Sequence, residues 1–579
     1  MLDPKARTIE PAPAACADAA EAAAPAVAGA GTHATRSRSA LALAATGVLA
    51  ACGGDGSGSV TGGTSPPPTA GPPAPAITAA QASRFLAQAT MGTTRAAITD
   101  VMTNGYAAWL NSQFAMPRAI SHWDWLTANG YRDSANINNQ AGFDATLWRQ
   151  MIVEPDQLRQ RIGFALLDFL VVGIDGVNLN WRQFAVAAYV DVLLDNAFGN
   201  YRTILDAITT NAAMGSFLTF LNNRKANAAT GAEPDENYAR ELMQLFTIGL
   251  YRLNPDGSLL SSGGAPVETY TQSDVTQLAR VFTGLQLASS DSTTPDRYRL
   301  PMVMNASLNE TGSSTFLGTT VSGGGMAAIK AALDTIFAHP NLPPFVSRQL
   351  IQRLVTSNPS PAYVGRVSAA FADNGAGVRG DMKAVIRGIL LDDEARSDAA
   401  LTSTTAGKLR EPVIRLTNWA RSFGATSASN AWAIGDTSNP STRLAQSAGR
   451  SQTVFNFFRP GYVPANTPIA AAGLVAPEFQ LVNEQSAVGY INFMQLVVAD
   501  TVGDVKADYS DLTSIATDSA ALVDEVNLRL AANQLGASTI TAIRNAVDSV
   551  SPTTASGPVN RVAIAILLTL ASPDYLVLR

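Results

Sequence analysis

The chain has 579 residues, of which 46% are hydrophobic and 15% are charged, and its formal net charge is −6. This length suffices for one large domain or for two or three ordinary ones, with enough apolar material for a sizeable core. A mildly acidic chain without a cluster of Lys and Arg argues against nucleic acid as a partner. The two cysteines are Cys16 and Cys52, which excludes a disulfide framework or a thiolate metal site beyond residue 52.

Residues 36–52 have the pattern of an export signal. Arg36 and Arg38 precede an uncharged run of small and apolar residues over 39–51, which leads directly to Cys52. A positive start, a short apolar middle and small residues at a cleavage point compose a signal peptide. A cysteine at that point is typical of a bacterial lipoprotein, whose thiol is acylated. We therefore expect residues 1–51 to be a leader and Cys52 to be the lipidation site that anchors the mature chain to a membrane.

The alternative, a buried helix that happens to end in Cys52, does not fit the segment that follows. Residues 52–78 are rich in Gly, Ser, Thr and Pro, and we expect a flexible linker between the lipid and the folded domain. Gly53 rather than an acid follows the cysteine, which favours the outer membrane as the location within the cell envelope. The longest later apolar runs, 164–172 and 562–570, fall short of the roughly 18 residues that span a bilayer and predict buried core helices.

The remainder, residues 79–579, is predicted to be a mainly α, multi-helix globular domain, because apolar residues recur at spacings of three and four. The predicted helices are 82–89, a pair within 94–114, 158–172, 181–198, 201–211, 237–251, 275–284, 327–338, 344–355, 362–374, 381–392, 412–423, 484–498, 519–532, 538–549 and 559–571. Strand-like alternation gathers around 250–325. There, residues 251–260 resemble a hairpin about a Pro-Asp-Gly turn, so we expect one small β-hairpin insertion.

Several kinds of active site are excluded. His122 and His339 are the only histidines beyond residue 52, too few for a three-His metal site, and no H-E-x-x-H, G-x-S-x-G or Walker A sequence is present. His339 precedes Pro340 at a predicted helix end, where a cation suits the helix dipole, and His122 is expected to pack. The G-x-G-x-x-G at 375–380 follows a helix rather than a strand, which predicts a helix–helix loop instead of a dinucleotide site. We expect no cofactor and no bound metal.

The densest polar constellation is DENYAREL at 235–242, where a predicted helix begins. Glu236 faces Arg240 at i,i+4 spacing on this helix. Glu241 lies closer to the apolar stripe, where an unpaired carboxylate is costly. We therefore expect Glu241 to meet a cation or hydrogen-bond donors from another segment, with Arg410 or Arg280 as the first candidates.

Two further polar pieces accompany this constellation. Thr271 and Asp274 fit a capping box at a helix start, and Arg410 and Glu411 lie in the charged turn KLREP at 408–412. The candidate site residues are thus Glu236, Glu241, Asp274, Arg410 and Glu411. Around one open cleft they would supply a general acid and base for hydrolysing a polymer, or ligands for a hard cation such as Ca²⁺. The alternative is a buried salt-bridge network that orients helices.

The same segments resemble the domain of unknown function 1800 family. The matching stretches are 236–250 (ENYARELMQLFTIGL), 270–275 (YTQSDV), 279–284 (ARVFTG), 85–92 (FLAQATMG), 339–340 (HP), 408–412 (KLREP) and 455–462 (FNFFRPGY). Together they span about 82–490, and the first is long and specific. The resemblance implies a secreted or lipid-anchored, largely helical protein whose activity is not established and which works with another exported protein.

The chain departs from this family where many members carry a Phe-Trp-His-x-His-Phe run. Here 164–170 reads FALLDFL, and a His-Asp…Lys stretch is replaced by NASLNE at 305–310. Chemistry that uses those histidines would be lost, or rebuilt from carboxylates. One function that follows is a non-catalytic lipoprotein that binds or scaffolds an exported partner through an exposed apolar or aromatic patch. The alternative is an extracytoplasmic hydrolase of polysaccharide or another envelope polymer. The missing histidines favour the first.

Overall fold

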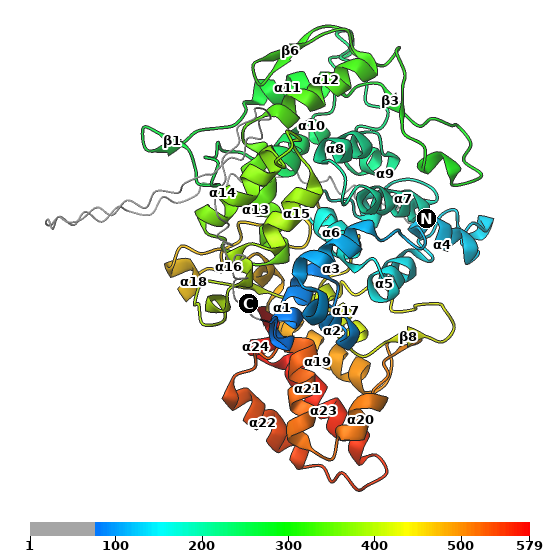
Figure 1. The fold of residues 1–579 in the computed structure, drawn as a ribbon. Coiled ribbons are helices and arrows are strands. Elements are labelled where there is room, and N and C mark those ends of the chain that lie inside the picture. The colour runs from blue at the N-terminus through cyan, green and yellow to red at the C-terminus, as the bar shows by residue number, and fades with distance from the viewer. Residues whose placement is uncertain (1–75) are drawn as a thin grey trace, which may run out of the picture. The chain divides into compact units, whose positions relative to one another are not determined.

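Helices dominate the computed structural model, which describes residues 76–579 (Figure 1). The expected mainly α fold is therefore confirmed. Residues 76–579 all belong to one unit of the chain. Cys52, the expected leader and most of the expected linker lie outside the described residues.

The helices of the first part of the chain run from blue to green in Figure 1. They are α1 (Ala79–Ala89), α2 (Arg95–Asn104), α3 (Tyr106–Ala115), α4 (His122–Ala128), α5 (Phe143–Val153), α6 (Gln157–Leu167), α7 (Arg182–Asp195), α8 (Tyr201–Thr209), α9 (Ala212–Phe217), α10 (Asn237–Glu241), the π-helix η3 (Leu242–Thr247), α11 (Gln272–Val281) and α12 (Gly325–Ala338). Short 3₁₀ turns lie at η1 (Ser134–Asn136), η2 (Ile174–Gly176) and η4 (Asp296–Tyr298).

The second part of the chain contributes the remaining helices. They are α13 (Leu342–Leu354), α14 (Pro361–Ala372), α15 (Met382–Leu390), α16 (Asp393–Arg396), α17 (Pro412–Ser422), α18 (Pro468–Ala471), α19 (Glu484–Ala499), α20 (Ser510–Ile515), α21 (Ser519–Ala531), α22 (Ala537–Asp548), α23 (Gly557–Ala571) and α24 (Pro573–Leu576), with 3₁₀ turns η5 (Asp398–Leu401) and η6 (Pro477–Leu481). The loop at 375–380 joins α14 to α15, as predicted.

Short antiparallel strand pairs make up the β structure of the described residues. Three pairs lie in the expected insertion: β1 (Ser261–Ser262) with β2 (Ala265–Pro266), β3 (Leu285–Gln286) with β4 (Val303–Met304), and β5 (Ser314–Phe316) with β6 (Thr319–Val321). Two other pairs were not predicted: β7 (Lys408–Leu409) with β10 (Val577–Leu578), and β8 (Thr426–Ser427) with β9 (Val505–Lys506). Each joins segments far apart in sequence, so no local sequence pattern predicts the pairing.

Local sequence sets several helix boundaries. Thr78 and Gln81 cap the start of α1 reciprocally, and Thr271 and Asp274 do the same for α11, as expected. The helix predicted at 158–172 ends early, because α6 stops at Leu167 and the buried segment after it is irregular. The helix predicted at 237–251 continues from α10 as a π-helix.

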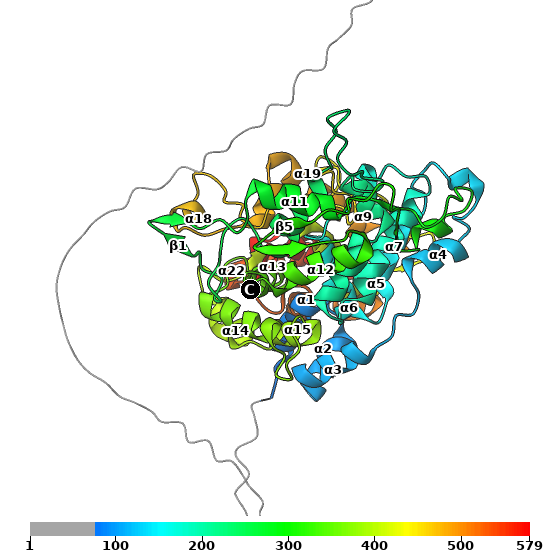
Figure 2. The ribbon, with the colours of Figure 1, turned by 90° about the horizontal axis from the view of Figure 1, so that it is seen from above.

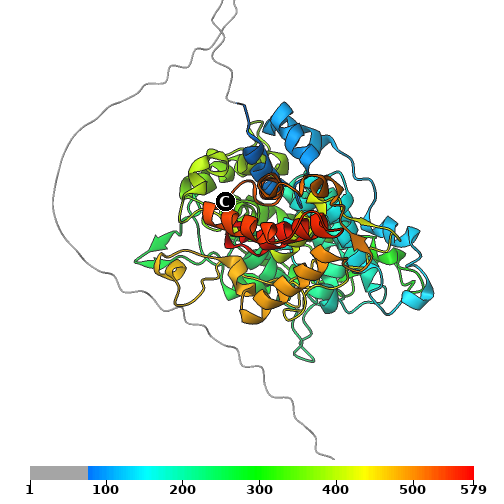
Figure 3. The same cartoon turned by 90° about the horizontal axis from the view of Figure 1, so that it is seen from below.

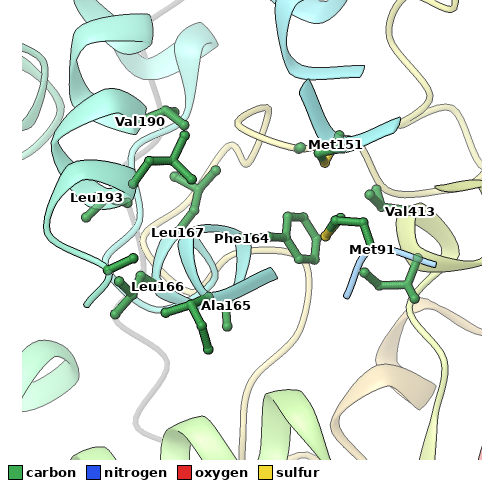
Figure 4. Packing of buried hydrophobic residues seen from close by; sticks show 14 of the residues in the cluster. Met91, Met151, Phe164, Ala165, Leu166, Leu167, Val190, Leu193 and Val413 are labelled. Atoms are coloured by element: carbon green, nitrogen blue, oxygen red, sulfur yellow. The ribbon is translucent and has the colours of Figure 1, made fainter. Parts of the chain in front are cut away.

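Helix α6 lies at the centre of the packing and contacts α1, α3, α5, α7 and α13. Figure 4 shows its residues Phe164, Ala165, Leu166 and Leu167 among buried apolar side chains of α5, α7, α17 and the segment after α1, namely Met151, Val190, Leu193, Val413 and Met91. The positions where the resemblance would place histidines are therefore taken by apolar residues of this core and by Asp168, which is also buried.

The two ends of the described chain pack together, because α1 contacts α21. Figure 3, from below, shows the C-terminal helices in orange and red side by side, and α23 contacts α19, α20, α21 and α22. Figure 2, from above, shows β5 beside α11 and α12, and α11 contacts both. None of the helices within residues 76–579 combines the length and the apolar character needed to span a bilayer.

Candidate functional site

Glu236 is tied to its own helix and to α11. Its Oε2 lies 2.9 Å from Arg240 Nη2 and accepts a hydrogen bond from Gln272 Nε2 at 2.8 Å, while its Oε1 accepts from Thr276 Oγ1 at 2.6 Å. Partial burial raises the pKa of Glu236, but the hydrogen bonds from Thr276 and Gln272 and the Arg240 charge outweigh it and lower the pKa overall. The carboxylate is therefore held ionised by partners within α10 and α11.

Asp274 also has its oxygens occupied. Its Oδ2 accepts from the Thr271 backbone N–H and hydroxyl at 2.7 Å each, and its Oδ1 accepts from Leu317 N at 2.8 Å. Burial raises the pKa of Asp274, but these hydrogen bonds lower it overall. Asp274 thus caps α11 and fixes the segment after β5, which is a structural task.

Glu241 does not meet the cation that the sequence predicted. Its side chain is only 8% exposed, and its buried Oε2 has no hydrogen-bond partner within the described residues. Arg280 instead lies 3.4 Å from Glu310, and Arg410 lies against the chain end. Burial raises the pKa of Glu241 to about 7, with the Arg240 charge opposing the shift. The expected pairing of Glu241 with Arg280 or Arg410 is wrong because both arginines make other tertiary contacts.

Arg410 and Glu411 are neighbours in sequence but reach in different directions. Arg410 Nε donates to Tyr575 O at 2.7 Å, and the guanidinium lies 4.9 Å from the Tyr575 ring centroid. Glu411 Oε2 accepts from Gln446 Nε2 at 2.8 Å. The five candidate residues therefore fall into two groups, at α10 and α11 and at the start of α17, and Figure 1 shows these places well apart.

A buried ionic cluster surrounds Glu411, and the sequence did not predict most of its members. Its six members come from α6 and its C-terminal end, α13, β7, the start of α17 and η6, and all are almost fully buried: Arg161, Asp168, Arg353, Lys408, Glu411 and Glu478. Three cations face three carboxylates. The one local sign in the sequence is that Arg161 and Asp168 are seven residues apart, which places them on one helical face.

Lys408 is the centre of this ionic cluster. Its Nζ lies 2.8 Å from Glu478 Oε1 and 3.5 Å from Glu411 Oε1, and donates to Arg353 O at 2.7 Å. Asp168 Oδ1 accepts from Asn456 Nδ2 at 2.7 Å. Burial, reinforced by the Glu411 charge and opposed by the cations, raises the pKa of Asp168 well above its usual range. Burial also raises the pKa of Glu478.

The ionic cluster is closed to large molecules. Oxygen atoms of Asp168, Glu411 and Glu478 are buried without a hydrogen-bond partner, as are nitrogen atoms of Arg161 and Arg353. The cavity beside Asp168 and Asn456 holds about 10 Å³, which is room for one water at most. The cluster can therefore tie helices together, but it cannot admit a polymer.

Three of the motif segments that carry the family resemblance converge beside α13. Gly249, at the end of the first motif, and Pro460 and Gly461, in FNFFRPGY, line one cavity of about 340 Å³ with Phe345 and Arg348 of α13. The turn KLREP contacts the C-terminal end of α13, where Lys408 Nζ donates to Arg353 O. Gly249 has a φ of +72°, and a Cβ there would meet the Phe345 ring at 2.9 Å, so glycine is required.

A second, larger cavity of about 760 Å³ also contains Arg348 in its wall. Its charged lining residues are Arg348, Asp393, Glu394 and Arg579, and Glu394 is occupied because its Oε1 accepts from Ser360 N at 3.0 Å. We call the two cavities together the α13 groove. Arg348 is exposed, and its guanidinium makes neither a hydrogen bond nor an ion pair within residues 76–579.

The histidines have no role at the groove. His122 is buried, and burial together with the charges of Arg118 and Arg149 lowers its pKa well below the usual range. His339 ends α12, but burial and the charges of Arg252 and Arg379 lower its pKa to about 4. The helix end therefore carries a neutral imidazole and not the expected cation. Across the described residues, no group of three or more His, Cys, Asp or Glu is arranged to hold a metal ion.

Comparison with known proteins agrees with the motif segments. A model for a family described as a protein of unknown function, DUF1800, matches residues 84–577. No curated protein and no solved structure matches the chain. The match covers almost all of the described residues, including the motif segments at α10, α11, α17 and the α13 groove. The chain belongs to the DUF1800 family.

Proposed function

We propose that the mature chain is a cell-envelope lipoprotein that binds or scaffolds another exported protein. The observation that carries this proposal is the α13 groove, where motif segments distant in sequence form one surface. Apolar side chains of its lining are exposed: Leu250 is 48% exposed, Leu259 is 53% exposed and Tyr251 is 38% exposed. Exposed apolar patches beside a cavity are typical of protein interaction sites.

The charge of Arg348 at the α13 groove indicates which kind of partner would bind there. Arg348 is a cation without a carboxylate partner in the described part of the chain, and it belongs to both cavities. A partner segment that presents apolar side chains with an acidic residue between them would fill the apolar cavity and pair with Arg348.

A hydrolase of polysaccharide or another envelope polymer is the second candidate. The observation that favours it is the pKa of Glu241, about 7, which suits a general acid at neutral pH. Against it, Glu236 and Asp274 are occupied by structural hydrogen bonds, and Arg410 and Glu411 lie at α17. A purified chain that cleaves peptidoglycan or an exopolysaccharide, and loses that activity on Glu241→Gln with its fold intact, would establish this function instead.

The binding proposal is tested by site-specific photocrosslinking in cells. A photoreactive amino acid at Leu250 should give a discrete adduct with one exported protein, whereas the same residue at Met102, an exposed position on α2 that is 43% accessible, should not. Arg348→Glu should weaken the association of the two purified proteins at least tenfold, and Arg348→Lys should weaken it less. Identical adducts at both positions, or an unchanged affinity for Arg348→Glu, would contradict the proposal.

The anchor needs its own test, since Cys52 lies outside the described residues. Cys52→Ser should leave the chain unlabelled by radioactive fatty acid and should move it from the membrane fraction to the soluble fraction. Cys16→Ser, in the expected leader, is the matched control and should change neither result. A serine variant at residue 52 that still incorporates fatty acid would refute lipidation at this site.

A further inference from the structure

A separate apolar cavity lies where the chain end meets α17 and α19. It has a volume of about 250 Å³, and apolar side chains from four places form most of its wall. These are Leu409 and Pro412 before and in α17, Phe479 and Leu481 of η6, Ala487 and Ile491 of α19, and Pro573, Leu576 and Val577 at the chain end. The pairing of β7 with β10 places Leu409 beside the chain end.

The polar side chains of this wall are Arg415, Ser486 and Tyr490. Two of them are occupied, because Ser486 Oγ donates to Leu481 O at 2.7 Å and Tyr490 OH donates to Leu570 O at 3.1 Å. Within the described part of the chain, Arg415 is the one charged residue of this wall. Its side chain is 6% exposed, its Nε donates to Arg410 O at 2.8 Å, and its guanidinium lies 4.9 Å from the Tyr490 ring centroid.

Arg415 and Arg410 form a pair of buried cations without an ion-pair partner among the described residues. Both stack on tyrosine rings, and the buried Nη2 of Arg410 has no hydrogen-bond partner. The carboxylates that act on Arg415 from a distance, Glu478 and Glu411, are held by Lys408. A buried charge without a counter-ion is unfavourable, so an anion at the Arg415 end of the cavity would be stabilised.

We propose that this cavity binds a medium-chain fatty acid, with its carboxylate on Arg415 and its hydrocarbon tail along the apolar wall. A guanidinium recognises a carboxylate through two parallel hydrogen bonds. At about 30 Å³ for each water-sized group, 250 Å³ holds roughly eight such groups, which matches an eight-carbon acid. The exposed apolar residues Val482 and Ile491 at the wall extend the apolar surface to the outside. The proposal is independent of the α13 groove.

Calorimetric titration of the purified full-length chain tests this proposal with octanoate as the probe. Octanoate should bind one to one, octanol at least tenfold more weakly, and acetate not detectably. Arg415→Gln should remove the preference for octanoate over octanol. Because Arg415 is buried, Arg415→Gln could fail to fold, so a second variant tests the same cavity at an exposed position of its wall. Ala487→Trp should fill the cavity and block octanoate binding.

Val488→Trp is the matched control, since Val488 is the next residue of α19, is exposed and does not line the cavity. It should bind octanoate like the unchanged chain. Equal affinities for octanol and octanoate, or unchanged binding in Ala487→Trp, would overturn the proposal. Binding of a peptide with a free C-terminal leucine, without binding of octanoate, would also overturn the proposal, because the ligand would then be the C-terminus of a protein.

Discussion

Lys408→Met tests whether the buried ionic cluster holds the fold together. Lys408 contacts two carboxylates, Glu478 at 2.8 Å and Glu411 at 3.5 Å, and both carboxylates are 1% exposed. Methionine has a similar volume, so the substitution removes the charge and leaves little cavity. Breaking a buried ion pair by removing one partner costs about 3–5 kcal/mol, because the remaining charge is uncompensated.

The expected change in melting temperature follows from the size of the folded unit. A cooperative unit of roughly 500 residues unfolds with an entropy near 1 kcal/mol per kelvin, so a loss of 3–5 kcal/mol lowers the melting temperature by about 3–5 °C. Differential scanning calorimetry of the variant and the unchanged chain measures this. Lys330→Met is the matched control, because Lys330 is exposed on α12, and it should shift the melting temperature by less than about 1 °C.

A second substitution separates charge from packing. In Lys408→Met/Glu478→Gln one of the two stranded carboxylates becomes neutral, and we expect recovery of a part of the lost stability. A Lys408→Met chain that melts with the unchanged chain would refute the reasoning, since the carboxylates would then be hydrated or protonated without cost. A double variant less stable than the single one would place the loss in packing instead of charge.

Two further predictions concern α10 and α11. The pKa of Glu241 is raised from 4.5 to about 7, so the folded chain binds the proton more tightly than the unfolded chain and stability falls as pH rises through this window. The free energy of unfolding of Glu241→Gln should therefore equal that of the unchanged chain at pH 4.5 and exceed it at pH 8 by about 1–2 kcal/mol, a value discounted for partial solvent access. Thermal unfolding that shows equal stability of the two chains at both pH values would refute this prediction. Asp274→Ala removes the cap of α11 and the contact with Leu317, and should destabilise by about 1–2 kcal/mol in thermal unfolding. Asp500→Ala, at an exposed position after α19, is the control and should change little.

Sequence alone determined the features that depend on neighbours along the chain. Apolar residues at spacings of three and four predicted most of the helices, and Thr271 with Asp274 predicted the cap of α11, because these interactions close within one or two turns. The motif segments identified the family for the same reason: a local string of residues suffices. Helices α4 and α5 were missed, since both carry apolar residues on several faces and give a weak period.

Only the tertiary structure decided which polar groups meet. Lys408 finds Glu478 seventy residues away, and Asp168 finds Asn456 across 288 residues, because α6, α13 and η6 pack around the start of α17. Spacing along the chain carries no information about such pairs, and a buried charge takes whichever partner the packing offers. For that reason Glu241 lacks the cation predicted for it, while Arg415, beside an apolar cavity to whose wall β7 and β10 contribute, has no ion-pair partner in the part of the chain that the structure describes.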